Sequence, residues 1–355
     1  MTTASPPPSP ASWPPAPAAA PTPPGRRLDL PIIGAEYPQL LRTPRSRWWH
    51  PLLSAGLVLG SVLVLLAVLT LPMMLALVSE VGWDVFASAD PADLARVEEA
   101  LFSAPMMLLN NLMLAAFIGI AVLAVAVCHP VAARFVHSVQ GRIRWRWLLR
   151  AHLVLLPLFL VYVLGTWALD GAPTAPRAED WVWLVVMAFL LTPLQAAGEE
   201  YLFRGWLLLA IGSWFRRPLP AIVLAAAVSA VTFSLAHGSF DPWILLDLSV
   251  FAVAAVLLTW RTGGLEAAVA LHVVNNVVVI VFGTLAGTVN ESFVDVETSG
   301  SPLGTAVSAS VIALSTALLL WQARRAGIAR TVPVSGTSEA SLADSTALPS
   351  STVTP

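Results

Sequence analysis

The chain has 355 residues, of which 57% are hydrophobic and only 11% are charged, and its formal net charge is −2. A soluble globular domain carries about 25% charged residues. The low charge content therefore excludes an ordinary water-soluble protein, and most of the surface is expected to face lipid. The single cysteine, Cys128, excludes an intramolecular disulfide and a cysteine-based zinc cluster.

The N-terminal segment is rich in proline and alanine, with ten prolines between Pro6 and Pro24. It lacks the apolar core of a secretory signal, and its composition buries too little surface to fold. We predict a disordered tail over residues 1–47. The other end of the chain, residues 324–355, is rich in Ser and Thr and is predicted to be a second disordered tail.

Between these tails lie eight apolar runs of the length that crosses a bilayer, which is about 20 residues. The predicted spans are Leu52–Val78, Pro105–Cys128, Leu148–Leu169, Trp181–Gly198, Pro220–His237, Pro242–Trp260, Leu265–Ala286 and Thr305–Trp321. The predicted fold is an all-α integral membrane protein, a bundle of about eight transmembrane helices. Residues 48–170 are predicted to hold the first three transmembrane helices. Residues 181–286 are predicted to form a transmembrane core that contains the polar residues, and residues 304–323 the last helix. The stretch Tyr201–Phe215 either extends the fourth span or lies along the interface.

Arginine placement orients the predicted spans, because cytoplasmic loops of membrane proteins are enriched in positive charge. When both termini are placed in the cytoplasm, 17 of the 19 arginines lie inside, and only Arg96 and Arg177 lie outside. We therefore expect both termini in the cytoplasm. The absence of lysine suggests GC-rich coding, so we expect a multi-pass protein of a bacterial plasma membrane.

Ionisable residues gather in predicted spans four to seven, although each costs at least about 2.5–3.5 kcal/mol at the middle of a membrane helix. They are Glu199, Glu200, Arg204, His237, Asp247 and His272, and Asn275 and Asn276 lie close by in the sequence. Glu200 and Arg204 are four residues apart, so an ion pair on one helix face is expected. Glu266, near a predicted span end, is expected to pair with Arg261 or with solvent.

Three short motifs occur in this region: EEYLFRG at 199–205, FSLAH at 233–237 and HVVNN at 272–276. They resemble the EExxxR, FxxxH and HxxxN motifs of the CAAX-protease and bacteriocin-processing family, also named CPBP or Abi. The resemblance covers about residues 181–286. It implies a bundle of about eight transmembrane helices and endoproteolysis of a membrane-associated peptide or protein. It also implies a catalytic group formed by Glu199, His237, His272 and Asn276.

Hydrolysis of a peptide bond requires an activated water and donors for the developing oxyanion. Glu199 is the best candidate for the base, and His237 could hold the same water. His272 and Asn276 could donate to the oxyanion. Three further residues are assigned supporting roles: Glu200 and Arg204 as an ion pair that fixes the helix, and Phe233 as packing for His237.

A metal-dependent mechanism would use some of the same atoms. Glu199, His237 and His272 could bind Zn²⁺ and leave a position open for water. The HExxH signature of zinc proteases is absent, so the residues leave both mechanisms open. In either case the expected partners are the lipid bilayer and a membrane-associated substrate, with no role for nucleic acid.

Two other classes of function are compatible with polar groups in a membrane. A proton-coupled transporter places Glu, Asp and His at mid-membrane, but it usually shows repeats with matching interruptions in two halves. The second class is a non-catalytic immunity or scaffold protein. The predicted span ends raise one difficulty for a common site. They place His237 on the opposite side of the membrane from Glu199 and His272, about 25 Å away at a rise of 1.5 Å per residue.

Overall fold

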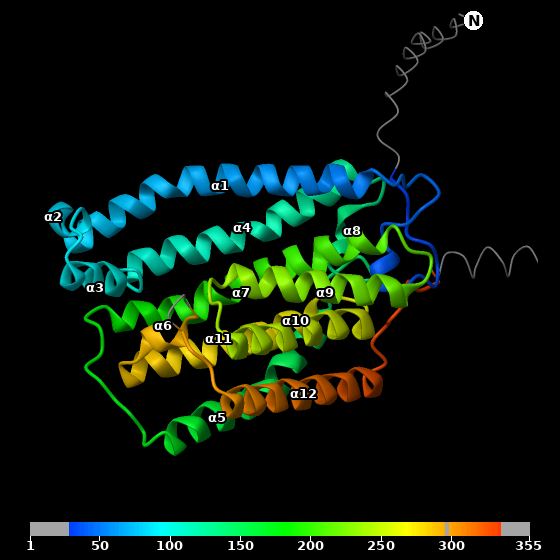
Figure 1. The fold of residues 1–355 in the computed structure, drawn as a ribbon. Helices are drawn as coiled ribbons and strands as arrows, with labels where there is room; N and C mark the ends of the chain where they lie inside the picture. The colour runs from blue at the N-terminus through cyan, green and yellow to red at the C-terminus, as the bar shows by residue number, and fades with distance from the viewer. Residues whose placement is uncertain (1–27, 295–297, 335–355) are drawn as a thin grey trace, which may run out of the picture.

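The computed structural model describes residues 28–294 and 298–334 (Figure 1). The described residues are helical, with three isolated β-bridges and no strand among them. The predicted all-α fold is therefore confirmed. The outer parts of the two predicted tails, residues 1–27 and 335–355, lie outside the described residues.

Within the described residues, seven helices are long and apolar enough to cross a membrane. They are α1 (His50–Val81), α4 (Ala104–Cys128), α5 (Trp145–Leu169), α9 (Pro218–Ala236), α10 (Pro242–Thr262), α11 (Glu266–Ala286) and α12 (Pro302–Arg325). The shorter elements outside the fourth predicted span are η1 (Tyr37–Gln39), α2 (Trp83–Phe86), α3 (Pro91–Ala100), η2 (Ala133–Val136) and η4 (Val289–Ser292). Each long helix begins and ends within about one turn of a predicted span, and the chain is a multi-pass membrane protein.

The fourth predicted span is a broken helix. It consists of α6 (Trp181–Leu190), α7 (Thr192–Glu200), the π-helical segment η3 (Tyr201–Leu207) and α8 (Leu208–Gly212). The two parts meet at an angle of 42° at Leu191, just before Pro193. Proline has no N–H to donate and displaces the preceding turn, which explains the bend. The stretch after Glu200 thus extends the fourth span, as the first of the two sequence alternatives predicted.

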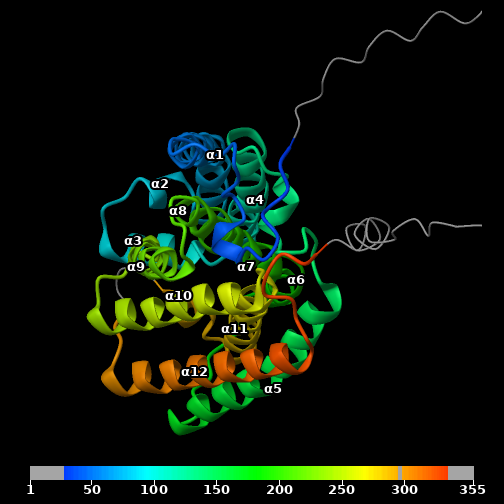
Figure 2. The same cartoon turned by 90° about the vertical axis from the view of Figure 1, so that its right-hand side faces the viewer.

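Helix α11 lies at the centre of the bundle (Figure 2) and is the most buried of the seven long helices. It packs against α5, α6, α7 and α10. Helices α1 and α4 lie on one side of it, and α5 and α12 on the opposite side. Helix α1 is the least buried, and it exposes large apolar side chains such as Leu59 and Leu63. Such a surface is suited to lipid, because an α-helix satisfies its own backbone hydrogen bonds.

The segment 28–47 was predicted to be disordered, and this prediction is wrong. Tyr37, Leu40 and Leu41 have no exposed surface and belong to a hydrophobic cluster. The Tyr37 hydroxyl donates to the Val136 carbonyl at 2.5 Å. The proline-rich composition ends before this segment, so its apolar residues can pack under the helices.

The beginning of the C-terminal tail, residues 326–334, was also predicted to be disordered but is ordered. The Val332 N–H donates to the Ala35 carbonyl, and the Gly34 N–H donates to the Val332 carbonyl, both at 3.0 Å. Segments 28–47 and 326–334 therefore meet at one end of the bundle, which we call the terminal end. The prediction failed because these contacts join opposite ends of the sequence.

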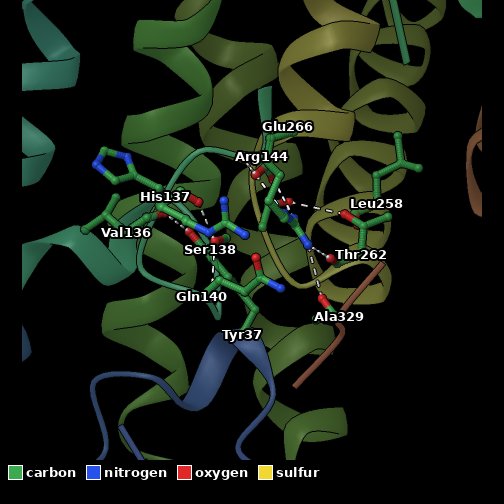
Figure 3. Close-up of polar contacts among 12 residues, drawn as sticks. Tyr37, Val136, His137, Ser138, Gln140, Arg144, Leu258, Thr262, Glu266 and Ala329 are labelled. Atoms are coloured by element: carbon green, nitrogen blue, oxygen red, sulfur yellow. Dashed lines mark hydrogen bonds and ion pairs between the residues drawn. The ribbon is translucent and has the colours of Figure 1, made fainter. Parts of the chain in front are cut away.

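A buried ion pair holds the terminal end together (Figure 3). Arg144, which precedes α5, places its guanidinium against both carboxylate oxygens of Glu266, at 2.8 and 2.5 Å. The same guanidinium donates to the carbonyls of Thr262 at 2.8 Å and Ala329 at 3.1 Å. The expectation that Glu266 pairs with Arg261 or solvent is wrong, because Glu266 is 3% exposed and faces a loop 122 residues away.

Candidate active site

The three sequence motifs come together where α7, η3, α9 and α11 meet. Glu199 and Glu200 end α7, and Arg204 follows in η3. His272 lies in the second turn of α11, which packs against α7. A π-helix admits an extra residue and is frequent at functional sites. These neighbouring elements bring residues about 70 positions apart in the sequence into contact.

Glu200 is the centre of a buried charge cluster. Its Oε1 accepts from Arg204 Nη1 at 2.9 Å and lies 2.9 Å from His272 Nδ1. Glu200 and Arg204 have no exposed surface, and His272 is 4% exposed. The predicted ion pair of Glu200 with Arg204 is confirmed. A buried charge is stable only with a partner, so Glu200 fixes both the cation of Arg204 and the orientation of the His272 ring.

Aromatic rings surround the Arg204 guanidinium. The guanidinium carbon Cζ lies 4.7 Å from the ring centre of Phe233, 5.6 Å from that of Phe203 and 6.0 Å from that of Phe251. The faces of such rings attract a cation, most strongly where water is excluded. Phe251 also contacts the His272 ring, with ring centres 5.0 Å apart. No sequence motif pointed to Phe251, which reaches the cluster from α10.

Glu199 lies on the other side of His272. Its Oε2 is 3.8 Å from His272 Nε2, whereas His272 Nδ1 faces Glu200. The His272 ring is thus held between two carboxylates. Glu199 is 8% exposed, so it is the less enclosed of the two.

Gln195 links Glu199 to the amide groups of α11. Its Nε2 donates to Glu199 Oε1 at 2.5 Å, and its Oε1 accepts from Asn276 Nδ2 at 3.3 Å. Asn275 Nδ2 in turn donates to Asn276 Oδ1 at 3.0 Å. Gln195 was not identified from the sequence. It could have been recognised as a polar residue in an apolar helix, one turn before Glu199.

His237 occupies the edge of this group. It caps the C-terminus of α9, is half-buried, and its Nδ1 lies 2.8 Å from its own helix's Phe233 carbonyl. The His237 ring packs on the Phe233 ring at 4.6 Å, and the Phe233 ring lies 5.9 Å from that of His272. The separation of about 25 Å expected from the span ends is therefore wrong. Phe233, one turn before His237, reaches the level of His272.

The three residues considered as zinc ligands do not form a donor set. Within residues 28–294 and 298–334, no group of three His, Cys, Asp or Glu side chains is arranged to hold a metal ion. Glu199 and His272 lie together, whereas His237 packs on the Phe233 ring, which also contacts His272. A catalytic zinc site needs three protein ligands on one ion.

Comparison with known proteins supports the resemblance seen in the motifs. Residues 180–278 match the family model Rce1-like, described as type II CAAX prenyl endopeptidase Rce1-like. Over 112 residues the chain is 28% identical to the uncharacterized protein YyaK of Bacillus subtilis (strain 168). That match covers 30% of this chain and 37% of the relative. No solved structure matches the chain significantly.

The matched segment contains all three motifs, every residue of the charge cluster and Phe251. It also includes Gln195 and the broken fourth span. Residues 180–278 of this chain are thus similar to the Rce1-like, type II CAAX prenyl endopeptidase family.

Proposed function

We propose that the protein is an intramembrane endopeptidase of the CAAX-protease type, which hydrolyses a peptide bond of a membrane-associated protein or peptide. The observation that carries the proposal is the placement of the His272 ring between Glu199 and Glu200 within the family-matched segment. A carboxylate base and an imidazole that share one enclosed position are the groups that peptide hydrolysis requires.

Glu199 acts as the general base in this proposal. Its Oε2 and the Nε2 of His272 are 3.8 Å apart, too far for a direct hydrogen bond and close enough to share one bridging atom. A water bound to both would give its proton to Glu199 while its oxygen attacks the peptide carbonyl. When the C–N bond breaks, Glu199 returns that proton to the leaving amine.

His272 stabilises the oxyanion. In this role the ring donates from both nitrogens, through Nδ1 to the Glu200 carboxylate at 2.9 Å and through Nε2 to the oxyanion. Arg204 pairs with Glu200 and holds its carboxylate in place. Asn276 supplies a second donor next to Glu199 through the Gln195 bridge. A fixed donor aimed at developing charge needs no reorganisation during the reaction.

His237 contributes from the edge of the site. Its half-buried ring packs on the Phe233 ring, which also contacts His272, and we place it against the bound substrate. In this proposal His237 belongs to the catalytic group, whereas Phe233, Glu200 and Arg204 hold the catalytic side chains in position. We further propose a bacterial plasma membrane, with both termini cytoplasmic, from the arginine distribution.

The test is the substitution Glu199→Gln, which keeps the shape and the hydrogen-bonding capacity of the side chain and removes the base. Loss of a general base lowers the rate by about 10²–10⁴-fold. Membrane-associated peptides from cells with each form would be compared by mass spectrometry. Glu98→Gln, on the exposed surface of α3, is the matched control and should cleave like the unmodified chain.

The same experiment separates the other classes of function. A transporter or a scaffold would yield identical peptides with both forms of residue 199. Cleavage products that persist undiminished in the well-folded Glu199→Gln protein would refute the proposed role of Glu199.

A further inference from the structure

A cavity lies at the terminal end of the bundle, away from the candidate active site. It has a volume of about 430 Å³. Its walls are Gln140 and residues 142–144 of the loop, the first three residues of α5 and the segment 327–329. Figure 3 shows Gln140, Arg144 and Ala329 of this region in close-up. The lining contains three arginines and no Asp or Glu.

Two of these arginines lack an acidic partner. Arg144 is neutralised by Glu266, as described above. Arg142 and Arg146 are exposed, and neither forms an ion pair within the part of the chain that the structure describes. The cavity therefore carries about two uncompensated positive charges. An anion is the ligand that such a lining attracts.

The beginning of α5 adds further donors. This helix of 25 residues has no side-chain cap and no acidic residue in its first turn. Unsatisfied N–H groups at a helix N-terminus favour an anion. Independently, Trp147 lines the cavity, is 3% exposed, and its indole Nε1 has no acceptor among the described residues. Buried N–H groups in folded proteins nearly always have an acceptor, so an acceptor supplied at this position would be stabilising.

The position of the cavity favours a lipid over a soluble anion. Trp145 is 68% exposed at the start of a helix apolar enough to span the membrane. Exposed tryptophan at a span end lies at the level of the lipid headgroups. Leu149 and Leu153 are also exposed and follow Trp145 at intervals of four, on the same helix face. This apolar strip leads from the cavity along α5, as an acyl chain would.

We propose that this cavity binds the phosphate headgroup of an anionic phospholipid, from the leaflet at the terminal end of the bundle. Arg142 and Arg146 contact the phosphate, the N-terminus of α5 supports it, and an acyl chain lies along Leu149 and Leu153. Basic pockets beside membrane helices are known to select such headgroups. The inference does not depend on the proposed peptidase activity.

The test uses the full-length protein, delipidated in detergent and offered phosphatidylglycerol and phosphatidylcholine with identical acyl chains. Native mass spectrometry counts the bound lipid. We expect preferential retention of phosphatidylglycerol. Each arginine near a membrane surface changes anionic lipid binding by about fivefold, so Arg142→Gln with Arg146→Gln should weaken it roughly 25-fold.

The matched control is Arg216→Gln with Arg217→Gln, which removes the same charge from an exposed loop between α8 and α9. This pair should retain phosphatidylglycerol like the unmodified chain. Equal retention of both lipids, or equal loss in both double variants, would overturn the proposal. Displacement of the lipid by inorganic phosphate at millimolar concentration would also overturn it, in favour of a soluble anion.

Discussion

The polar side chains of the candidate site hold one another in place. Gln195 shows this most directly, because its carboxamide donates to Glu199 and accepts from Asn276 at the same time. An amide with both groups engaged has a single orientation, and it fixes the rotamer of the carboxylate beside it. We therefore assign Gln195 as a positioning residue for Glu199.

The variant Gln195→Met should separate this role from a purely structural one. Methionine has a similar length but neither donates to Glu199 nor accepts strongly from Asn276. Since a small misplacement of a reacting group can cost about 100-fold, kcat should fall by up to that factor while KM changes little. Steady-state kinetics on a reporter peptide measure both constants. Gln195→Glu, which can accept from Asn276 but repels Glu199, should not restore the rate.

At the scale of elements, the position of the site depends on a close approach of α7 to α4. A Cβ added at Gly198 would lie 2.0 Å from the Leu114 carbonyl oxygen of α4. Any other residue at this position must push the helices apart. Because Gly198 precedes Glu199, the same contact determines how far the carboxylate lies from α11.

Gly198→Ala should therefore destabilise the protein by about 1–3 kcal/mol, the usual cost of overpacking. It should also lower activity, because α7 moves as a unit with Glu199. Gly119→Ala on α4 is the control, since a Cβ there meets no atom within 4 Å. That variant should be neutral or slightly stabilising, because alanine is a better helix former. Thermal unfolding in detergent distinguishes the two, and equal melting temperatures would contradict the role of Gly198.

At the scale of the whole molecule, the terminal end joins parts of the chain that are far apart in sequence. Arg144 connects the loop before α5 to the start of α11 through Glu266, and to the C-terminal segment through Ala329 (Figure 3). Glu36 of the N-terminal segment accepts from Trp260 Nε1 at 2.5 Å and pairs with Arg330 at 3.0 Å. These contacts hold α10 and α11 in place at their connecting turn.

Glu266→Gln should weaken this assembly strongly. It leaves the buried Arg144 without a negative partner, and removing one member of a buried ion pair costs about 3–5 kcal/mol. The comparison is Asp93→Asn, which breaks an exposed pair with Arg96 and should cost less than about 1 kcal/mol. Both are measured as a loss of unfolding free energy in the same detergent. A Glu266→Gln protein as stable as Asp93→Asn would show that the pair does not hold the terminal end.

The sequence by itself determined the helices, their approximate ends and the residue types of the site. These features are local: a membrane helix satisfies its own backbone, and about 20 apolar residues are sufficient to specify it. The spacing of Glu200 and Arg204 likewise fixed their ion pair, because residues four apart share a helix face.

Only the tertiary structure decided how distant residues meet. The bridge from Gln195 to Asn276, the ring of Phe251 beside His272 and the pairing of Glu266 with Arg144 each join different elements. The contact of Phe233 in α9 with His272 in α11, which brings the end of α9 to the site, depends on how these helices lie in the bundle. Such contacts depend on how helices pack, and apolar helices in lipid carry little sequence information about their partners.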